Sequence, residues 1–237
     1  MQTYKNYDFI LFDLDGTLTD PRLRITKSVQ YALASFGIVE SNLNNLLHFI
    51  GPPLKKSFAE YYDFNDAQAD EAVRKYREYF SETGIYENAV YPGIPDLLSK
   101  LSNKGKVLAI ATSKPTVFAA KILEHFKIID SFAFVAGSNL DGSRVEKFEV
   151  IQYALSHLSV VDHEKIVMGG DRKHDIIGAK KVGIDSIGVL YGFGSPGEMN
   201  SESPTYIVKS VSELEKVLTK HQESAGSEPY PHTQDTR

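Results

Sequence analysis

The chain of 237 residues contains no cysteine, which excludes a disulfide scaffold, a thiolate nucleophile and a cysteine-ligated zinc site. It also lacks any apolar run long enough to cross a membrane, and its opening residues, MQTYKNYD, hold no apolar secretory core. Positive charge is not in excess either. The formal net charge is -5, so no basic field points to a nucleic acid polymer. Together these absences predict a soluble, cytoplasmic protein that acts on neither membranes nor nucleic acids.

Two carboxylates stand where an apolar run ends near the start of the chain. The run at residues 9–12 is rich in aromatic and branched side chains, which predicts a buried strand, and Asp13 and Asp15 follow it. Residues just past such a strand lie at the carboxyl edge of a sheet, where open α/β sheets place their ligands. Burying two carboxylates is costly unless a cation, proton or donor compensates. We therefore expect Asp13 and Asp15 to act with a metal.

Other interpretations of this stretch are a surface turn and the start of a calcium loop. Asp and Gly are good turn formers. A calcium loop needs a third oxygen ligand, where Thr17 stands, and a Glu further on, for which Asp20 is poorly placed. A calcium loop also follows a helix, whereas this stretch follows a strand-like run. Both interpretations are weaker than a pair of carboxylates that act with a metal.

Strand and helix patterns alternate over most of the remaining chain. Strands are expected near residues 106–112, 132–136, 165–169, 186–189 and 206–208, and helices near 93–101, 115–126, 146–157, 176–182 and 211–220. This alternation implies a parallel sheet with right-handed crossovers. The expected fold is α/β, with a doubly wound, Rossmann-like core.

Residues 25–84 break the alternation directly after the first strand. They show four helical patterns, punctuated by glycines and prolines, and no buried-strand run. We interpret them as an inserted α-helical cap. The predicted domains are a core of residues 1–19 and 87–220 and a cap of residues 20–86. Residues 221–237, polar with two prolines, are expected to form a disordered tail.

Four motifs together resemble the haloacid dehalogenase superfamily of phosphohydrolases over about residues 8–218. FDLDGTL at residues 12–18 is similar to its first signature, and LAIATSKP at residues 108–115 to its second. Lys147 stands where the third places a lysine, and VMGGDRKHD at residues 167–175 is similar to the fourth. The inserted cap matches the branch that includes phosphoglycolate phosphatases, nucleotidases and β-phosphoglucomutases.

The resemblance implies a role for each carboxylate. Asp13 would be the nucleophile that forms an aspartyl-phosphate, and Asp15 the general acid and base, with its backbone carbonyl on the metal. Asp171 would complete a Mg²⁺ site with Asp13. For Asp175 we leave three roles open: contact with a water on the metal, charge pairing with Lys147, and a helix cap.

Other residues of the motifs would bind the phosphoryl group. The resemblance favours Thr112 as a hydroxyl donor and Lys147 as a cation that offsets the charge on Asp13, and we place Gly16, Thr17 and Ser113 among the substrate-binding residues. Lys114 is a rival to Lys147 as this cation. Two residues depart from the family pattern, since Phe148 follows Lys147 where proline is frequent and Arg172 follows Asp171 where a small residue is frequent.

The cap loop GPPLKK at residues 51–56 is a candidate for choosing the substrate, because the family uses this loop for that purpose. Gly51 and Lys55 are the residues we assign to substrate binding there. The competing interpretation is a helix junction with solvated lysines.

The expected function is Mg²⁺-dependent hydrolysis of a small phosphomonoester. The substrate is expected to be a small phosphorylated metabolite, with phosphoglycolate the leading candidate. The alternatives are a 5′-nucleotidase or pyrophosphatase, a sugar phosphomutase, and a phospho-acceptor protein without turnover. Asp15 argues against the transport ATPases and dehalogenases of the superfamily, which lack this second Asp. The chain is expected to be a monomer, as no coiled coil or paired apolar surface is visible.

Overall fold

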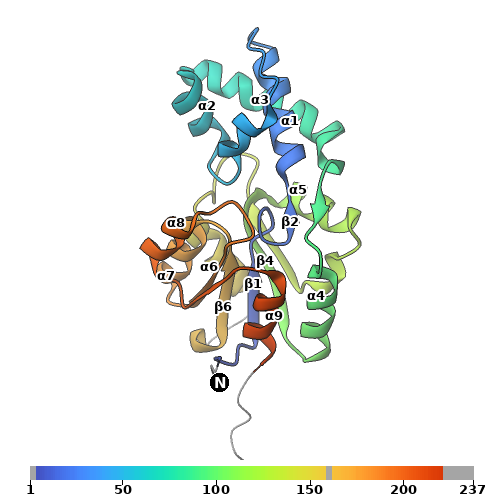
Figure 1. Cartoon of the computed structure of the whole chain (residues 1–237), viewed down its shortest axis with the longest axis vertical. Coiled ribbons are helices and arrows are strands. Elements are labelled where there is room, and N and C mark those ends of the chain that lie inside the picture. The colour runs from blue at the N-terminus through green and yellow to red at the C-terminus, as the bar shows by residue number, and fades with distance from the viewer. Residues whose placement is uncertain (1–3, 159–161, 221–237) are drawn as a thin grey trace, which may run out of the picture.

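The computed structural model describes residues 4–158 and 162–220. Its centre is a six-stranded sheet in the order β5-β4-β1-β6-β7-β8 (Figure 1). These strands are β1 (Phe9–Phe12), β4 (Val107–Pro115), β5 (Phe134–Ser138), β6 (Ile166–Gly170), β7 (Asp185–Val189) and β8 (Tyr206–Val208). Every neighbouring pair is parallel, which confirms the predicted doubly wound α/β fold.

Helices cover both faces of the sheet. The apolar sides of α6 (Lys147–Leu158) and α7 (Lys173–Val182) pack with Leu11 on one face. On the other face α4 (Ile94–Asn103), α5 (Thr116–His125) and α9 (Val211–Thr219) pack with Ile10 and Phe12. Successive residues of β1 therefore point to opposite helical layers, as the two-residue period of a strand requires. Its sequence FILF is apolar throughout for that reason.

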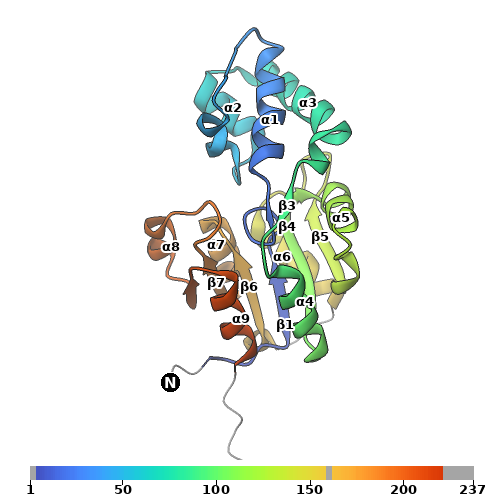
Figure 2. The same ribbon diagram turned by 45° about the vertical axis from the view of Figure 1, so that its right-hand side comes forward.

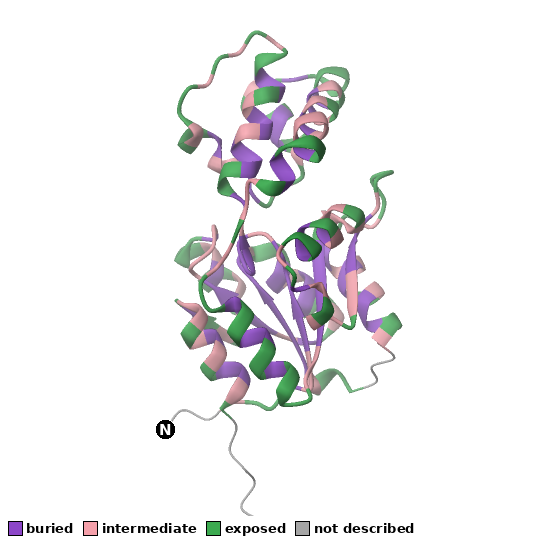
Figure 3. Cartoon of the chain, turned by 90° about the vertical axis from the view of Figure 1, so that its right-hand side faces the viewer, coloured by how far each residue is buried: buried purple, intermediate pink, exposed green. Residues whose placement is uncertain are grey.

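A helical unit interrupts the core after β1. It contains α1 (Arg22–Ala34), the 3₁₀ helix η1 (Leu43–Phe49), α2 (Leu54–Tyr62), α3 (Asp66–Glu82) and the 3₁₀ turn η2 (Gly84–Tyr86). We call it the cap. It stands above the carboxyl edge of the sheet (Figure 2), and the residues on the inward sides of its helices are buried, as in the core (Figure 3). The chain enters it through β2 (Thr19–Asp20) and leaves through β3 (Ala89–Val90), which pair antiparallel.

Several elements differ from the sequence-based expectation. One of the four helical patterns expected within residues 25–84, at residues 43–49, forms a 3₁₀ helix instead of an α-helix, and α7 begins at Lys173 instead of near residue 176. The pair β2–β3 was not predicted, because two-residue strands carry no periodic signal. Helix α8 (Pro196–Glu202) was also missed, although Ser195 caps it and Pro196 opens it. The expected disordered tail lies outside the described residues. Among the residues that the structure describes, no helix is long and apolar enough to span a membrane.

Candidate active site

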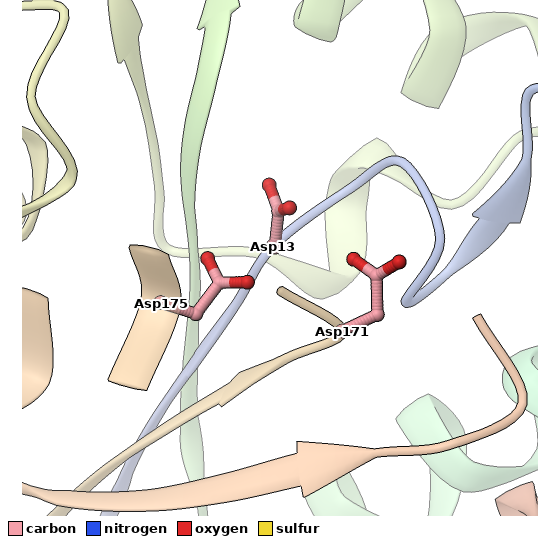
Figure 4. Close-up of side chains that lie close together, drawn as sticks. All are labelled: Asp13, Asp171 and Asp175. Carbon is pink, nitrogen blue, oxygen red and sulfur yellow. The ribbon is translucent and has the colours of Figure 1, made fainter. Parts of the chain in front are cut away.

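Three buried aspartates meet at the carboxyl edge of the sheet (Figure 4). Asp13 follows β1, Asp171 follows the adjacent strand β6, and Asp175 lies in the first turn of α7. One carboxylate oxygen from each lies within 4.8 Å of the others. Parallel neighbours end at the same edge, so pairing of β1 with β6 brings residues 158 positions apart together.

The ammonium of Lys147, at the start of α6, lies among these carboxylates. Its Nζ is 3.0 Å from Oδ1 of Asp13 and 2.8 Å from Oδ1 of Asp175, and it donates to the carbonyl of Ala111 at 3.1 Å. Asp175 thus pairs with Lys147, and its Oδ2 also accepts the backbone N–H of Arg172 as a helix cap. Two of the three roles left open for Asp175 are therefore present in the structure.

The charges of this cluster match a divalent cation. Three carboxylates and one ammonium leave a formal charge of -2, and the buried Oδ1 of Asp171 has no hydrogen-bond partner among the described residues. Hard oxygen ligands in this number suit Mg²⁺. Asp13, Asp171 and Asp175 could therefore hold Mg²⁺, and the donor set fits that ion.

The pKa values report the same excess of negative charge. Burial raises the pKa of Asp13 to about 6, against the opposing effect of Lys147. Burial, reinforced by the charges of Asp13 and Asp175, raises the pKa of Asp171 well above its ordinary value. For Lys147, Asp13 and Asp175 outweigh burial and raise the pKa. Without a cation, the aspartates are thus held together at an electrostatic cost.

Asp15 lies in a different electrostatic setting, between two cations. Its Oδ1 accepts a hydrogen bond from the guanidinium of Arg24, on α1 of the cap, and its Oδ2 is 2.7 Å from Nζ of Lys114, at the end of β4. Burial alone would raise the pKa of Asp15, but the two positive charges outweigh it and lower the pKa. Lys114, the rival cation of the sequence analysis, therefore lies beside Asp15, while Lys147 lies beside Asp13.

The two hydroxyls at the end of β4 have different surroundings. Thr112 is buried and its hydroxyl lowers the pKa of Asp13 by hydrogen bonding. Ser113 is exposed, and its carbonyl accepts the hydroxyl of Ser138 at 2.8 Å. The structure thus brings Thr112 to Asp13 and leaves Ser113 facing solvent.

Gly16 is required by close packing of the loop after β1 against Asp171. Its φ is +84°, and a Cβ there would lie 2.1 Å from Oδ2 of Asp171, so no larger residue fits. Thr17 next to it is fully buried, and its carbonyl accepts the hydroxyl of Tyr191 at 2.9 Å. These two residues therefore shape the loop that carries Asp13 and Asp15.

Sequence reasoning missed the loop YGFG at residues 191–194. The backbone N–H of Phe193 donates to Oδ2 of Asp171 at 2.8 Å, and this orients the carboxylate. A Cβ on Gly192 would lie 2.3 Å from the carbonyl of Gly16, and one on Gly194 would lie 2.0 Å from that of Asp171. The signal that could have found this loop is the pair of glycines at 192 and 194, shortly after the buried strand β7.

Arg172 joins the core to the cap. Its Nη1 donates to the carbonyl of Ile50 at 2.5 Å and its Nε to Oε1 of Glu198 at 3.0 Å. Gly51 has a φ of +103°, and a Cβ there would lie 2.7 Å from Nη1 of Arg172. Gly51 thus lies against the core. Lys55 instead pairs with Asp70 of the cap at 2.9 Å, and its assignment to substrate binding stays a prediction.

The comparisons with known proteins agree with this geometry. Residues 10–189 match the family described as haloacid dehalogenase-like hydrolase, and the chain belongs to that family. A 5′-nucleotidase of Pseudomonas aeruginosa is 50% identical over 215 residues, which cover 91% of this chain and 97% of the relative. A phosphoglycolate phosphatase of Colwellia psychrerythraea is 28% identical over 215 residues, which cover 87% of this chain and 95% of the relative.

The solved structures include a predicted phosphatase from Clostridium acetobutylicum. It is 50% identical, with a TM-score of 0.85 over 90% of this chain and 98% of the other. The chain is therefore a phosphatase of the haloacid dehalogenase-like family, and by reaction class a phosphoric monoester hydrolase.

Proposed function

We propose that this protein is a Mg²⁺-dependent phosphatase that hydrolyses a small phosphorylated metabolite through an aspartyl-phosphate on Asp13. The observation that carries the proposal is the cluster of Asp13, Asp171 and Asp175, with its charge of -2 after Lys147 is counted. When bound, Mg²⁺ would neutralise charge on the phosphoryl oxygens and orient Asp13, with the backbone carbonyl of Asp15 as a further ligand.

The residues divide the reaction into two steps. A carboxylate oxygen of Asp13 attacks phosphorus while Asp15, which must be in its protonated form for this step, gives its proton to the leaving oxygen, which departs as an alcohol. Asp15 then takes a proton from a water that attacks the aspartyl-phosphate, which releases inorganic phosphate and restores Asp13. The hydroxyl of Thr112 donates a hydrogen bond to a phosphoryl oxygen. Lys147 offsets the negative charges of Asp13 and of the phosphoryl group.

Two kinds of substrate are in question. The name of the relative at 50% identity favours a 5′-nucleotide, whereas the relative at 28% and the sequence-based expectation favour phosphoglycolate. Specificity would come from the cap, since closing a lid over the site excludes water and completes the pocket. A sugar phosphomutase shares Asp13 and Asp15, and rapid release of inorganic phosphate from simple esters would argue against it. The monomeric state and the cytoplasmic location stay predictions.

The mechanism is tested with Asp13→Asn. This variant should keep its fold and lose hydrolysis of p-nitrophenyl phosphate, because only the nucleophilic charge is removed. Asp130→Asn, at an exposed aspartate of η3 (Ile129–Ser131), is the matched control and should be as active as wild type. EDTA should abolish wild-type activity and Mg²⁺ should restore it. Activity of Asp13→Asn close to wild type would refute the mechanism.

A further inference from the structure

A second buried charge cluster lies beside the metal cluster and has the opposite sign. It consists of Asp15, Arg24 and Lys114, which two ion pairs hold together. One carboxylate and two cations leave a formal charge of +1. The side chain of Arg24 is fully buried and that of Lys114 is 10% exposed, so solvent screens this charge only weakly. The carboxylates of the neighbouring cluster offset part of this charge, and once a cation occupies that cluster the positive excess is left for an anion to balance.

Arg24 has unused hydrogen-bonding capacity. Its Nη2 contacts Asp15, but the buried Nε and Nη1 have no hydrogen-bond partner among the described residues. The ring of Phe80, on α3, lies 5.4 Å from Cζ of Arg24 and 5.0 Å from Nζ of Lys114. The aromatic ring holds the two cations close together without neutralising either of them. An arginine with donors left over in a buried site is a recognition element for an oxyanion.

The position of this cluster identifies the part of the substrate that it would contact. Lys147, Thr112 and the metal cluster lie on the side of Asp13, where the phosphoryl group would bind. Arg24 and Lys114 instead contact the two oxygens of Asp15, the group proposed to protonate the leaving oxygen. Arg24 also comes from the cap, which would cover the leaving group. The two cations therefore lie on the leaving-group side of the reacting bond.

We propose that Arg24 and Lys114 form a subsite for a negatively charged group, a carboxylate or a second phosphate, on the leaving group of the substrate. This inference rests on the proposed function and narrows its substrate class. The preferred substrates are then phosphomonoesters and anhydrides whose leaving group is itself an anion. Esters with an uncharged leaving group lack the ion that the subsite is built to bind.

The wild-type enzyme offers the first test, which needs no variant. Its kcat/KM is measured for 2-phosphoglycolate and for 2-hydroxyethyl phosphate, which has a similar size and an uncharged leaving group. Pyrophosphate and 5′-AMP form a second pair, which distinguishes a phosphate from a carboxylate as the anion. Since a charge-assisted hydrogen bond is worth about tenfold to a hundredfold in binding, we expect at least one anionic substrate to be preferred by about that factor.

Variants then assign the preference to residues. Arg24→Met and Lys114→Met should each reduce kcat/KM for the preferred anionic substrate about tenfold more than for its uncharged counterpart. Arg24→Lys keeps the charge and should recover part of the preference. Arg22→Met is the matched control, because Arg22 lies on the same helix but is exposed and pairs with Asp20. It should leave the preference unchanged, and circular dichroism establishes that each variant is folded.

The outcomes separate this inference from the function on which it rests. Wild-type hydrolysis of p-nitrophenyl phosphate without any preference for an anionic leaving group overturns the subsite alone. Equal losses across all substrates in Arg24→Met and Lys114→Met also overturn it, since the cations would then serve only Asp15. No hydrolysis of any phosphomonoester by folded wild-type protein with Mg²⁺ overturns the proposed function, and the subsite with it.

Discussion

Replacement of Lys147 by Met should lower the thermal stability of the protein and make that stability depend more strongly on Mg²⁺. The substitution keeps the length of the side chain but removes the ammonium that pairs with Asp13 and Asp175. The charge of the cluster then changes from -2 to -3. Removing one partner of a buried ion pair costs about 3–5 kcal/mol, because the other partner is left uncompensated. For a chain of this size, each kcal/mol lowers Tm by about 2–4 °C, so a fall of about 6–20 °C is expected without metal.

Mg²⁺ should reverse much of this loss. Binding to the folded state alone stabilises it by about 2.7 kcal/mol at a hundredfold excess over Kd. The variant site also attracts a cation more strongly, because a neighbouring positive charge is gone. The rise in Tm on adding Mg²⁺ should therefore be larger in Lys147→Met than in wild type. Turnover should still be lost, since the phosphoryl group would lack its ammonium partner.

The assay is thermal unfolding of wild type and variant in EDTA and in a Mg²⁺ series. Lys104→Met, at an exposed lysine after α4, is the matched control and should behave as wild type under both conditions. A Lys147→Met protein that melts at the wild-type temperature in EDTA would refute the charge argument. A smaller Mg²⁺-dependent rise than that of wild type would contradict it equally.

Three other predictions concern neighbouring parts of the structure. Gly16→Ala should abolish turnover and weaken stabilisation by Mg²⁺, because its Cβ would lie 2.1 Å from Asp171; unchanged titration of Tm by Mg²⁺ would argue against this. Arg172→Ala should raise KM more than it lowers kcat, since the cap loses its bond to the core at Ile50, and an unaltered KM would exclude that role. Asp185→Asn should destabilise the protein at neutral pH. Burial alone would raise the pKa of Asp185, but the hydrogen bonds from Lys5 and Tyr7 outweigh it, so the net pKa is lowered. The charge of Asp185 therefore stabilises the fold above a pH of about 4, and this stabilisation is lost as the pH falls through the lowered pKa. Urea unfolding at several pH values checks this, and a constant difference between wild type and variant would contradict it.

The sequence was sufficient for the sheet, because alternating strand and helix patterns are local, whereas the meeting of the aspartates was expected from the resemblance of the motifs to the phosphohydrolase superfamily. Asp13 and Asp171 each stand directly after a buried apolar strand, and parallel strands end at one edge. The fold gives the physical reason why the expectation drawn from the resemblance agrees with the structure. The fold class was predicted correctly from the alternating patterns. The roles of the individual residues stay proposals until variants are assayed.

Contacts that depend on the position of the cap could not be predicted. Arg24 reads as one charged residue among several on an amphipathic helix, and only the placement of α1 above the sheet brings it to Asp15. Arg172 reaches Ile50 across 122 positions of sequence. The ion pair of Lys55 with Asp70 of the cap was likewise not predicted from its neighbours in sequence. The contacts of Arg24 and Arg172 depend on how two folded units meet.

The paired strands β2 and β3 make the cap an exchangeable module. Thr19 is paired with Val90 and Asp20 with Ala89, so the chain leaves the core and returns to it at adjacent points, about 5 Å apart. Joining ends that already meet costs little chain entropy, so the connection between core and cap does not itself restrict what stands at residues 21–88. The aspartates at the edge of the sheet can thus be inherited unchanged while the lid is exchanged. Such an architecture lets one reaction serve many metabolites.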